Sequence, residues 1–355
     1  MNTPKFTIPN PSFHSEIKRR INEYFNKKGI SSTGNFSLYL KAAVLTIAFV
    51  AVYVHLVFFT PAVWFAIPEC LLLGLLTAAL GFNVMHDGAH GSFSKRKWIN
   101  SLAGLSLNML GANVFMWKTK HNVLHHSYTN IHELDDDIEA KPLLRFCKTQ
   151  KYYKIHKFQH HYFWAAYSLL YIWWVFVTDY KKYFLKRIGD MPIQRMTVAD
   201  HITFWGFKVL HAFLFVVLPI LTVGAIPWLI GFLVYGLFTG FILSIVFQLA
   251  HTVEGTTFLQ ASTQTGKIED EWALHQLKTT ANFANKNKFL CWWVGGLNFQ
   301  IEHHLFPKIS HIHYPAISKI IRKACQDYGF PYLEYPKTRL AVLSHISHLR
   351  TMSKR

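Results

Sequence analysis

Long apolar stretches alternate with polar segments along this chain, and the apolar stretches come in two pairs. The first pair covers 42–59 (AAVLTIAFVAVYVHLVFF) and 70–85, joined by TPAVWFAIPE. The second pair runs from about 204 to 221 and from 228 to 250, joined by TVGAIP. Because a helix needs about 20 apolar residues to cross a bilayer, the pattern predicts four transmembrane helices in two hairpins.

Two further apolar segments are also candidates for transmembrane helices. The segment 98–117 is long enough, but it carries Asn100, Asn108 and Asn113. The segment 162–177 is short and rich in Trp and Tyr, as segments at a membrane surface are. We therefore predict that both are helices lying in or near the interface.

The N-terminal segment shows the spacing of an amphipathic helix. Phe13, Ile17, Ile21 and Tyr24 fall on one helical face, and the basic residues lie largely elsewhere. This pattern predicts a surface helix that docks either on lipid or on the body of the protein.

The distribution of charge predicts which side of the membrane the polar regions occupy. The chain is 51% hydrophobic but has 37 Lys and Arg against 19 Asp and Glu, a formal net charge of +18. Neither Lys nor Arg occurs in 42–94 or in 209–266. Because basic residues stay on the cytoplasmic side of spanning segments, we expect the excess charge to face anionic lipid there. Nothing in the pattern supports binding to nucleic acid.

These patterns together predict an all-α integral membrane protein, multi-pass, with both termini cytoplasmic. A cytoplasmic helical cap and interfacial helices would complete it. The predicted regions are a cytoplasmic amphipathic segment at 1–41, hairpins at 42–85 and 204–250, a cytoplasmic or interfacial region at 86–203 and a cytoplasmic region at 251–355.

Histidines cluster at the predicted membrane exits. HDGAH places His86 and His90 four residues apart, a spacing that puts both on one helical face. HNVLHH repeats this spacing and adds an adjacent third histidine, and QIEHH contributes another adjacent pair. His251 stands alone, at the end of the fourth apolar stretch. The eight predicted metal ligands are His86, His90, His121, His125, His126, His251, His303 and His304.

Eight imidazoles exceed the needs of one zinc site, which takes three or four ligands. They suit two metal ions, each with about four nitrogen ligands and a position left for water or oxygen. Imidazole alone does not distinguish zinc, copper, iron and nickel. Neighbouring carboxylates that could orient the histidine rings are Asp87, Glu254 and Glu302. The acidic run 135–137 is either a further group of this kind or a solvated loop cap. No catalytic side chain beyond the metal centre is predicted.

The three motifs HDGAH, HNVLHHSYTN and QIEHHLFP resemble, in this order, the histidine boxes of the membrane fatty acid desaturases. The glutamine that opens the third box resembles the front-end branch, with delta-5 and delta-6 activities. Many members of that branch carry a fused cytochrome b5 domain with a His-Pro-Gly-Gly motif, which this sequence lacks. The expectation is therefore a front-end desaturase without that domain.

The resemblance implies two iron ions, cycling between Fe2+ and Fe3+, with O2 as co-substrate. It implies a fatty acyl-CoA or acyl-lipid substrate that receives a cis double bond. Two electrons would come from a separate donor, either a ferredoxin or cytochrome b5. The site would face the cytoplasm, from a bacterial inner membrane or the endoplasmic reticulum.

The sequence departs from the family pattern at two places. Three residues separate His121 from His125, where many relatives have two, and Gln300 occupies a histidine position. Because an amide oxygen is a poorer iron ligand than imidazole, we expect Gln300 to support the metal ligands or to hold a water molecule. A further motif, HKFQHH at 156–161, has the spacing of the second box but lies outside the three boxes. Since relatives carry a Gln-His pair there, we interpret Gln159 and His160 as structural or as part of an acyl entrance.

Other functions remain open on the sequence alone. A lipid hydroxylase or a sphingolipid desaturase could use the same scaffold, and a zinc-dependent membrane hydrolase or receptor is a more distant alternative. A metal transporter would place histidines along a path within the bilayer, whereas these cluster at membrane exits.

Overall fold

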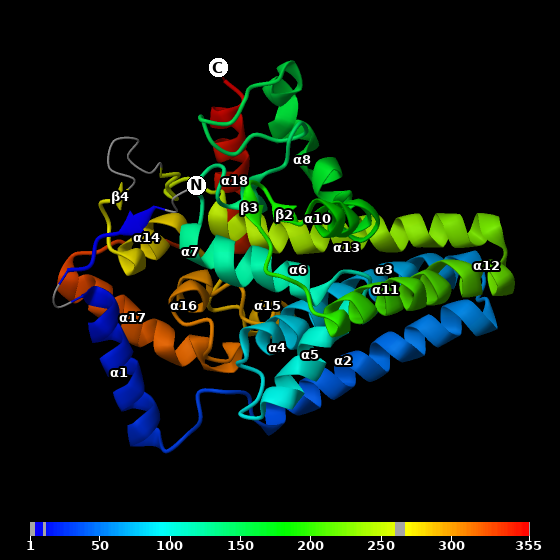
Figure 1. Cartoon of the computed structure of the whole chain (residues 1–355), viewed down its shortest axis with the longest axis horizontal. Coiled ribbons are helices and arrows are strands. Elements are labelled where there is room, and N and C mark those ends of the chain that lie inside the picture. The colour runs from blue at the N-terminus through cyan, green and yellow to red at the C-terminus, as the bar shows by residue number, and fades with distance from the viewer. Residues whose placement is uncertain (1–3, 10–11, 260–266, 355) are drawn as a thin grey trace. The chain divides into compact units, whose positions relative to one another are not determined.

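The computed structural model describes residues 4–9, 12–259 and 267–354, and within these ranges the chain is mostly helical (Figure 1). It divides into two compact units. Unit 1 comprises 1–33, 120–163 and 246–355, and unit 2 comprises 34–119 and 164–245.

Four helical segments in the described residues are long and apolar enough to cross a membrane, which confirms the number predicted. They are Phe36–Phe59, Val63–His90, Val198–Val223 and Ala225–His251. Three of them contain a π-helical turn. The components are α2 (Phe36–Val54) with η1 (His55–Phe59); α3 (Val63–Leu80), η2 (Gly81–Met85) and α4 (His86–His90); α11 (Val198–Ala212), η7 (Phe213–Val217) and α12 (Leu218–Val223); and α13 (Ala225–His251).

The long helices begin earlier than the apolar pattern alone predicts. Helix α2 starts at Phe36, because the side chain of Asn35 accepts the backbone N–H of Leu38 and caps it. Lys41, which we expected to precede the helix, lies inside it and is buried. Helix α3 likewise starts at Val63 and contains Pro68 in the segment expected to be a turn.

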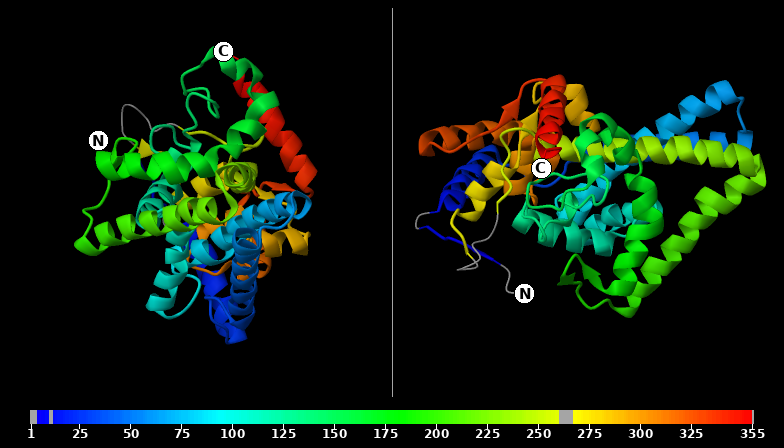
Figure 2. Two further views of the ribbon diagram at one scale, coloured as in Figure 1. Left: turned by 90° about the vertical axis from the view of Figure 1, so that its right-hand side faces the viewer. Right: turned by 90° about the horizontal axis from the view of Figure 1, so that it is seen from above.

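Close helix packing holds unit 2 together. Helices α2 and α3 pack against each other. A Cβ atom on Gly74 of α3 would lie 3.0 Å from the hydroxyl oxygen of Thr239 on α13, so the small residue lets these helices approach closely. A sharp turn at Gly224, with φ of 89°, joins α12 to α13 (Figure 2).

The two competing apolar segments do not form single long helices. Residues 98–117 divide between α5 (Lys97–Met109) and α6 (Val114–Lys118). Residues 162–177 divide among three helical pieces. These are α8 (Gln159–Ser168), α9 (Leu170–Trp173) and η6 (Trp174–Thr178), followed by α10 (Asp179–Leu185), β2 (Arg187–Ile188) and β3 (Met191–Pro192).

Helix α1 (Phe13–Lys28) of unit 1 packs on the protein itself. Its buried residues Phe13, Ile17 and Ile21 join a hydrophobic cluster with residues of α14 (Trp272–Thr279) and α17 (Tyr314–Tyr328). Phe25 completes the buried face and Tyr24 packs beside it, so the predicted face was correct except for its last position. Of the two docking alternatives, the structure has the helix on the protein body.

Short elements complete unit 1. They are β1 (Lys5–Phe6), η3 (Thr119–His125), α7 (His126–Tyr128), η4 (Asp136–Ile138), η5 (Lys154–Phe158), β4 (Lys267–Ile268), β5 (Asn282–Phe283), α15 (Lys288–Trp293), α16 (Gln300–Leu305), η8 (His311–His313), β6 (Glu334–Tyr335) and α18 (Thr338–Met352). Strand β1 pairs in parallel with β4 and β5 with β6, whereas β2 and β3 of unit 2 pair antiparallel.

Candidate metal centre

The first histidine motif lies in unit 2 and is buried. His86 and His90 begin and end α4, directly after the π-helical turn η2, and their ring centroids are 4.7 Å apart. The indole of Trp117 packs edge-on against both rings, at 5.7 Å from each. The four-residue spacing therefore brings the two imidazoles together, as predicted.

The second motif lies in unit 1, and its helix is not the α-helix on which the spacing argument relied. Residues 119–125 form the π-helix η3, which is a rare conformation that often marks functional sites. The rings of His121 and His125 are stacked, with centroids 5.1 Å apart. His126 follows in α7, and its ring lies 4.9 Å from that of His121.

The third motif and the lone histidine of α13 join this cluster. The ring of His304 lies 4.8 Å from that of His251 and 4.4 Å from that of His126. The ring of His303 lies 4.7 Å from that of His126. Six histidines from η3, α7, α13 and α16, separated by up to 183 residues in the chain, therefore meet inside unit 1.

The nitrogens of these rings approach closely enough to share metal ions. Among the residues of unit 1 that the structure describes, three groups have one ligand atom per residue with all these atoms inside 4.8 Å of one another. The groups are His125, His251 and His304; His126, His303 and His304; and His121, His125 and Asp137.

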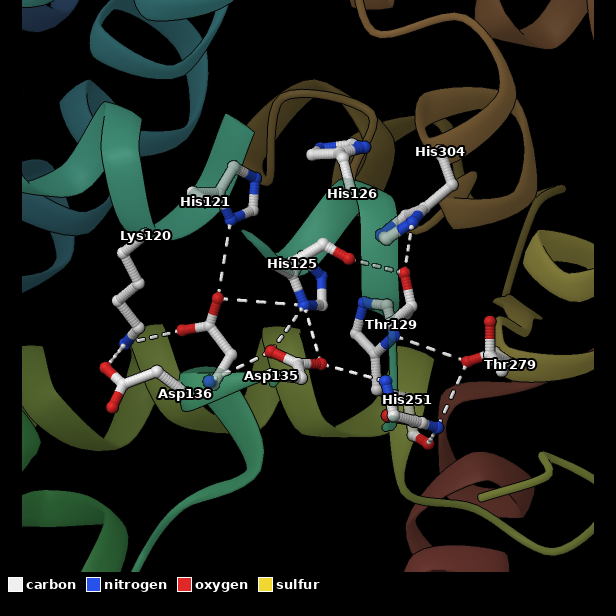
Figure 3. Close-up of polar contacts among 12 residues, drawn as sticks. Lys120, His121, His125, His126, Thr129, Asp135, Asp136, His251, Thr279 and His304 are labelled. Atoms are coloured by element: carbon white, nitrogen blue, oxygen red, sulfur yellow. Dashed lines mark hydrogen bonds and ion pairs between the residues drawn. The ribbon is translucent and has the colours of Figure 1, made fainter. Parts of the chain in front are cut away.

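A buried carboxylate orients the ring of His125. Its Nδ1 lies 3.0 Å from Oδ2 and 3.1 Å from Oδ1 of Asp135, so this nitrogen donates the hydrogen bond and Nε2 points away from it (Figure 3). Both side chains are fully buried. Burial lowers the pKa of His125, but Asp135 and Asp137 together raise it by more, so the net pKa is raised.

Side chains outside the histidine motifs orient the rings of the third motif. Nδ1 of His304 donates to Oε1 of Gln276 at 2.8 Å, and Oε1 also accepts the hydroxyl of Thr129 at 2.9 Å. Nδ1 of His303 lies 3.1 Å from the hydroxyl of Tyr314. Gln276 thus connects the second and third motifs through one amide oxygen.

An ion pair supports the second motif from one side. Nζ of Lys120 lies 2.6 Å from Oδ1 of Asp137 and 3.8 Å from Oδ2 of Asp136 (Figure 3). Burial alone would raise the pKa of Asp137, but Lys120 holds it well below its usual range. Burial lowers the pKa of His121 to about 4, so this imidazole stays neutral and able to bind a metal at neutral pH.

Gln300 lies within hydrogen-bonding distance of the cluster. Its Nε2 is 2.9 Å from Nε2 of His251, and Nδ1 of that histidine lies 3.3 Å from the carbonyl oxygen of Thr279. With Nδ1 donating to the carbonyl, Nε2 is left as the acceptor for the amide of Gln300.

The other predicted supporting residues lie in different surroundings. Glu302 is fully buried and accepts hydrogen bonds from Asn282 and from Tyr332, and its burial raises the pKa to about 7. Glu254 is exposed, and its carboxylate accepts a hydrogen bond from Ser347. Asp87 is buried in α4 of unit 2.

The motif HKFQHH at 156–161, which shares the spacing of the second box, makes structural contacts. Nε2 of His156 lies 2.8 Å from the carbonyl oxygen of Pro142, and Nδ1 accepts the N–H of Tyr153. Gln159 is fully buried, and its amide bonds to the backbone of Arg145 and of Leu349. These contacts support the structural alternative for Gln159.

The donor set of unit 1 fits a metal ion. Among the described residues, Nε2 of His125 and Nε2 of His304 are buried without a hydrogen-bond partner, although Nδ1 of each ring is bonded. A buried polar atom without a partner is costly, and a bound metal ion would satisfy both. The bonded Nδ1 atoms fix the tautomer in which Nε2 offers a lone pair.

The fold and site thus define a helical protein with four apolar helices of spanning length and a buried polyhistidine cluster. Residues 62–336 match the fatty acid desaturase family. The chain belongs to this family and is an enzyme of the fatty acid desaturase type, which confirms the resemblance of its three motifs.

Individual relatives align over nearly the whole chain. The chain is 36% identical to the sn-1 linoleoyl-lipid 6-desaturase of Arthrospira platensis, over 96% of this chain and 92% of the relative. It is 34% identical to the enzyme of the same name from Synechocystis, over 96% of each. It is also 34% identical to the acyl-lipid (8-3)-desaturase of Physcomitrium patens, over 96% of this chain and 72% of the relative. These likenesses support the front-end branch.

Several groups in the cluster carried no specific signal in the sequence. The acidic run 135–137 was a candidate, but nothing singled out Asp135 as the partner of His125. Gln276 and Tyr314 belong to segments without a histidine motif, and Thr129 lies in the second motif without being one of its histidines. Their role depends on long-range packing, which local spacing does not report.

Proposed function

We propose that this protein is an O2-dependent front-end desaturase that introduces a cis double bond into the long-chain acyl group of a lipid. The observation that carries the proposal is the convergence of six buried histidines. Hydrogen bonds at Nδ1 orient four of these rings, namely those of His125, His251, His303 and His304. The relatives are named as a linoleoyl-lipid 6-desaturase and an acyl-lipid (8-3)-desaturase, and these names favour an acyl-lipid over an acyl-CoA substrate.

We propose that eight histidines hold two iron ions, namely the six of unit 1 together with His86 and His90. When bound, iron and O2 supply the oxidising power to remove hydrogen from an unactivated methylene, which amino acid side chains lack. The protein residues supply what the metal requires. Asp135, Gln276 and Tyr314 hold ring orientations, and the surrounding buried side chains exclude water.

We assign Gln300 a positioning role. Its Nε2 lies 2.9 Å from Nε2 of His251, so it holds that ring before a metal binds, and iron bound to this nitrogen would displace the amide. An amide is a weaker ligand for iron than the histidine it replaces in the family pattern, and its location beside a ring nitrogen suits a hydrogen-bonding role better than direct ligation.

We further propose that the chain crosses the membrane in two hairpins and presents its site to the cytoplasm. Hairpins at 42–85 and 204–250 would leave 1–41, 86–203 and 251–355 on that side, where the basic residues concentrate. The electron donor, a ferredoxin or cytochrome b5, would then dock from the cytoplasm.

The decisive experiment is expression in a host of known lipid profile, followed by mass spectrometry that locates new double bonds. A new alkene toward the carboxyl end of an existing double bond supports the proposal. A hydroxylated product would instead support the lipid hydroxylase alternative. Metal analysis of the purified protein should find two irons per chain, whereas a single zinc would favour a hydrolase or receptor.

A further inference from the structure

Helix α15 (Lys288–Trp293) presents aromatic side chains to the surroundings, directly before the third histidine motif. Phe289 is 74% exposed and Trp292 is 41% exposed, although both are large and apolar. None of the six residues of the helix is buried. Exposed aromatic side chains gathered on one short helix indicate a surface that contacts another apolar phase.

The aromatic residues form a contiguous patch flanked by positive charge. The ring of Trp293 stacks with that of Phe289 at 6.2 Å and lies 5.8 Å from that of Trp292. Lys288 is the first residue of the helix and Lys286 lies two residues before it, and both are exposed. Tryptophan and phenylalanine beside lysine are typical of segments that lie at the boundary between lipid and water.

The location of the helix in unit 1 suits such a boundary. Gln300 lies 2.9 Å from His251, the last residue of the fourth apolar helix. Trp293 precedes Gln300 by seven residues, and a chain of that length spans at most about 25 Å. The connection is therefore long enough for the aromatic patch to lie at the same membrane depth as the C-terminal end of α13.

A hydrogen-bonded backbone turn connects the aromatic patch to the third histidine motif. Gly296 donates its N–H to the carbonyl oxygen of Cys291 at 2.9 Å, and Phe299 donates to that of Gly296 at 2.8 Å. Gly296 has φ of 67°, and a Cβ atom there would lie 3.0 Å from Cβ of His311. The backbone of this turn has little conformational freedom. The position of α15 therefore restricts the positions of Gln300, His303 and His304.

We propose that α15 is an interfacial anchor: its aromatic face inserts among the lipid headgroups, and Lys286 and Lys288 bind lipid phosphates. The occupant of this surface is the bilayer itself. The anchor holds the third histidine motif at the membrane surface. This inference goes beyond the desaturase activity and requires only that the chain spans a membrane.

The test is a depth measurement on the full-length protein. Phe289→Cys, in a Cys291→Ser background, is labelled with a fluorophore sensitive to its environment. The protein is reconstituted in nanodiscs of phosphatidylcholine with a minor share of phosphatidylglycerol. Lys319→Cys in the same background, an exposed site on α17, provides the matched control.

We expect spin-labelled lipid to quench the label at 289 several-fold more strongly than the label at 319, and aqueous iodide to show the reverse order. Replacing both Lys286 and Lys288 by Gln should weaken the lipid quenching at 289. If iodide quenches the label at 289 and lipid does not, the patch faces water and the proposal is wrong. If neither quencher reaches it, another part of the protein covers the patch and the proposal is equally wrong.

Discussion

Nδ1 of His125 lies 3.0 Å from Oδ2 of Asp135, and both side chains are fully excluded from solvent. Asp135 also accepts the backbone N–H groups of Asn130 and Asp137. The carboxylate thus holds both the ring and the loop that follows it. A buried pair of this kind fixes the tautomer and increases the basicity of the nitrogen that remains for a metal.

Asp135→Asn should therefore lower iron affinity, by about 10- to 100-fold if the pair acts as carboxylate–histidine pairs do in other metal sites. The amide keeps the size of the side chain but loses its charge. Iron per chain after dialysis against a graded chelator measures the effect. Asp136→Asn is the matched control because Asp136 contacts Lys120 instead of a histidine. Equal iron retention in both variants would contradict the proposed role.

Gln276→Leu should weaken iron binding by the third motif, because Nδ1 of His304 and the hydroxyl of Thr129 lose their shared acceptor. Gln276→Glu keeps an acceptor of the same shape and should retain most of the iron. The visible spectrum of the cobalt-substituted protein reports ligand geometry independently of turnover. Gln326→Leu, at an exposed site on α17, should change nothing. A Gln276→Leu spectrum identical to that of the unaltered protein would exclude the positioning role.

His345 should make stability fall as the pH drops below neutrality. Burial lowers its pKa from 6.5 to about 4, and its Nδ1 lies 2.7 Å from the carbonyl oxygen of Thr252. Between these values the unfolded chain binds a proton that the folded chain does not, so stability present at pH 7 is lost as the pH falls toward 4. A shift of this size corresponds to about 3 kcal/mol.

Thermal midpoints of metal-free protein in detergent, measured from pH 7 to pH 4, test this expectation. His345→Gln should flatten part of the decline, whereas His161→Gln, at an exposed site, should leave the slope unchanged. An unaltered slope in His345→Gln would show that other groups govern the acid sensitivity.

A buried ion pair in unit 2 gives a separate prediction about folding. Nζ of Lys208 lies 2.9 Å from Oδ2 of Asp179 and also donates to the carbonyl oxygens of Gly111 and Val175. Lys208→Met leaves the buried carboxylate of Asp179 with the hydrogen bond from Trp174 but without its ion-pair partner, and should cost about 3–5 kcal/mol.

The double variant Lys208→Met with Asp179→Asn should recover part of this loss, since neither buried charge then remains. Unfolding free energies of the unaltered protein, the two single variants and the double variant give the coupling energy. Lys181→Met, at an exposed site, is the control. Additive effects of the two changes would mean that the pair does not interact.

The hydrophobic pattern predicted the long helices well because bilayer thickness sets a length that any spanning segment must meet locally. Their ends were less accurate. The cap formed by Asn35 and the position of Pro68 within α3 are side-chain and backbone details that a count of apolar residues does not contain.

The sequence by itself determined the family, since three histidine motifs in a fixed order at the ends of apolar segments are a local and specific signature. It also predicted the face of α1 that is buried, but not whether lipid or protein covers it. The π-helical form of residues 119–125 was not predicted, because i and i+4 spacing reads the same in either helix.

Only the tertiary structure decided which groups support the histidines. Asp135 follows His125 by ten residues, but Gln276 and Tyr314 reach the cluster from elements far from the second motif along the chain. A hydrogen bond depends on distance and direction in space. Segments far apart in sequence acquire both only when the core of unit 1 packs.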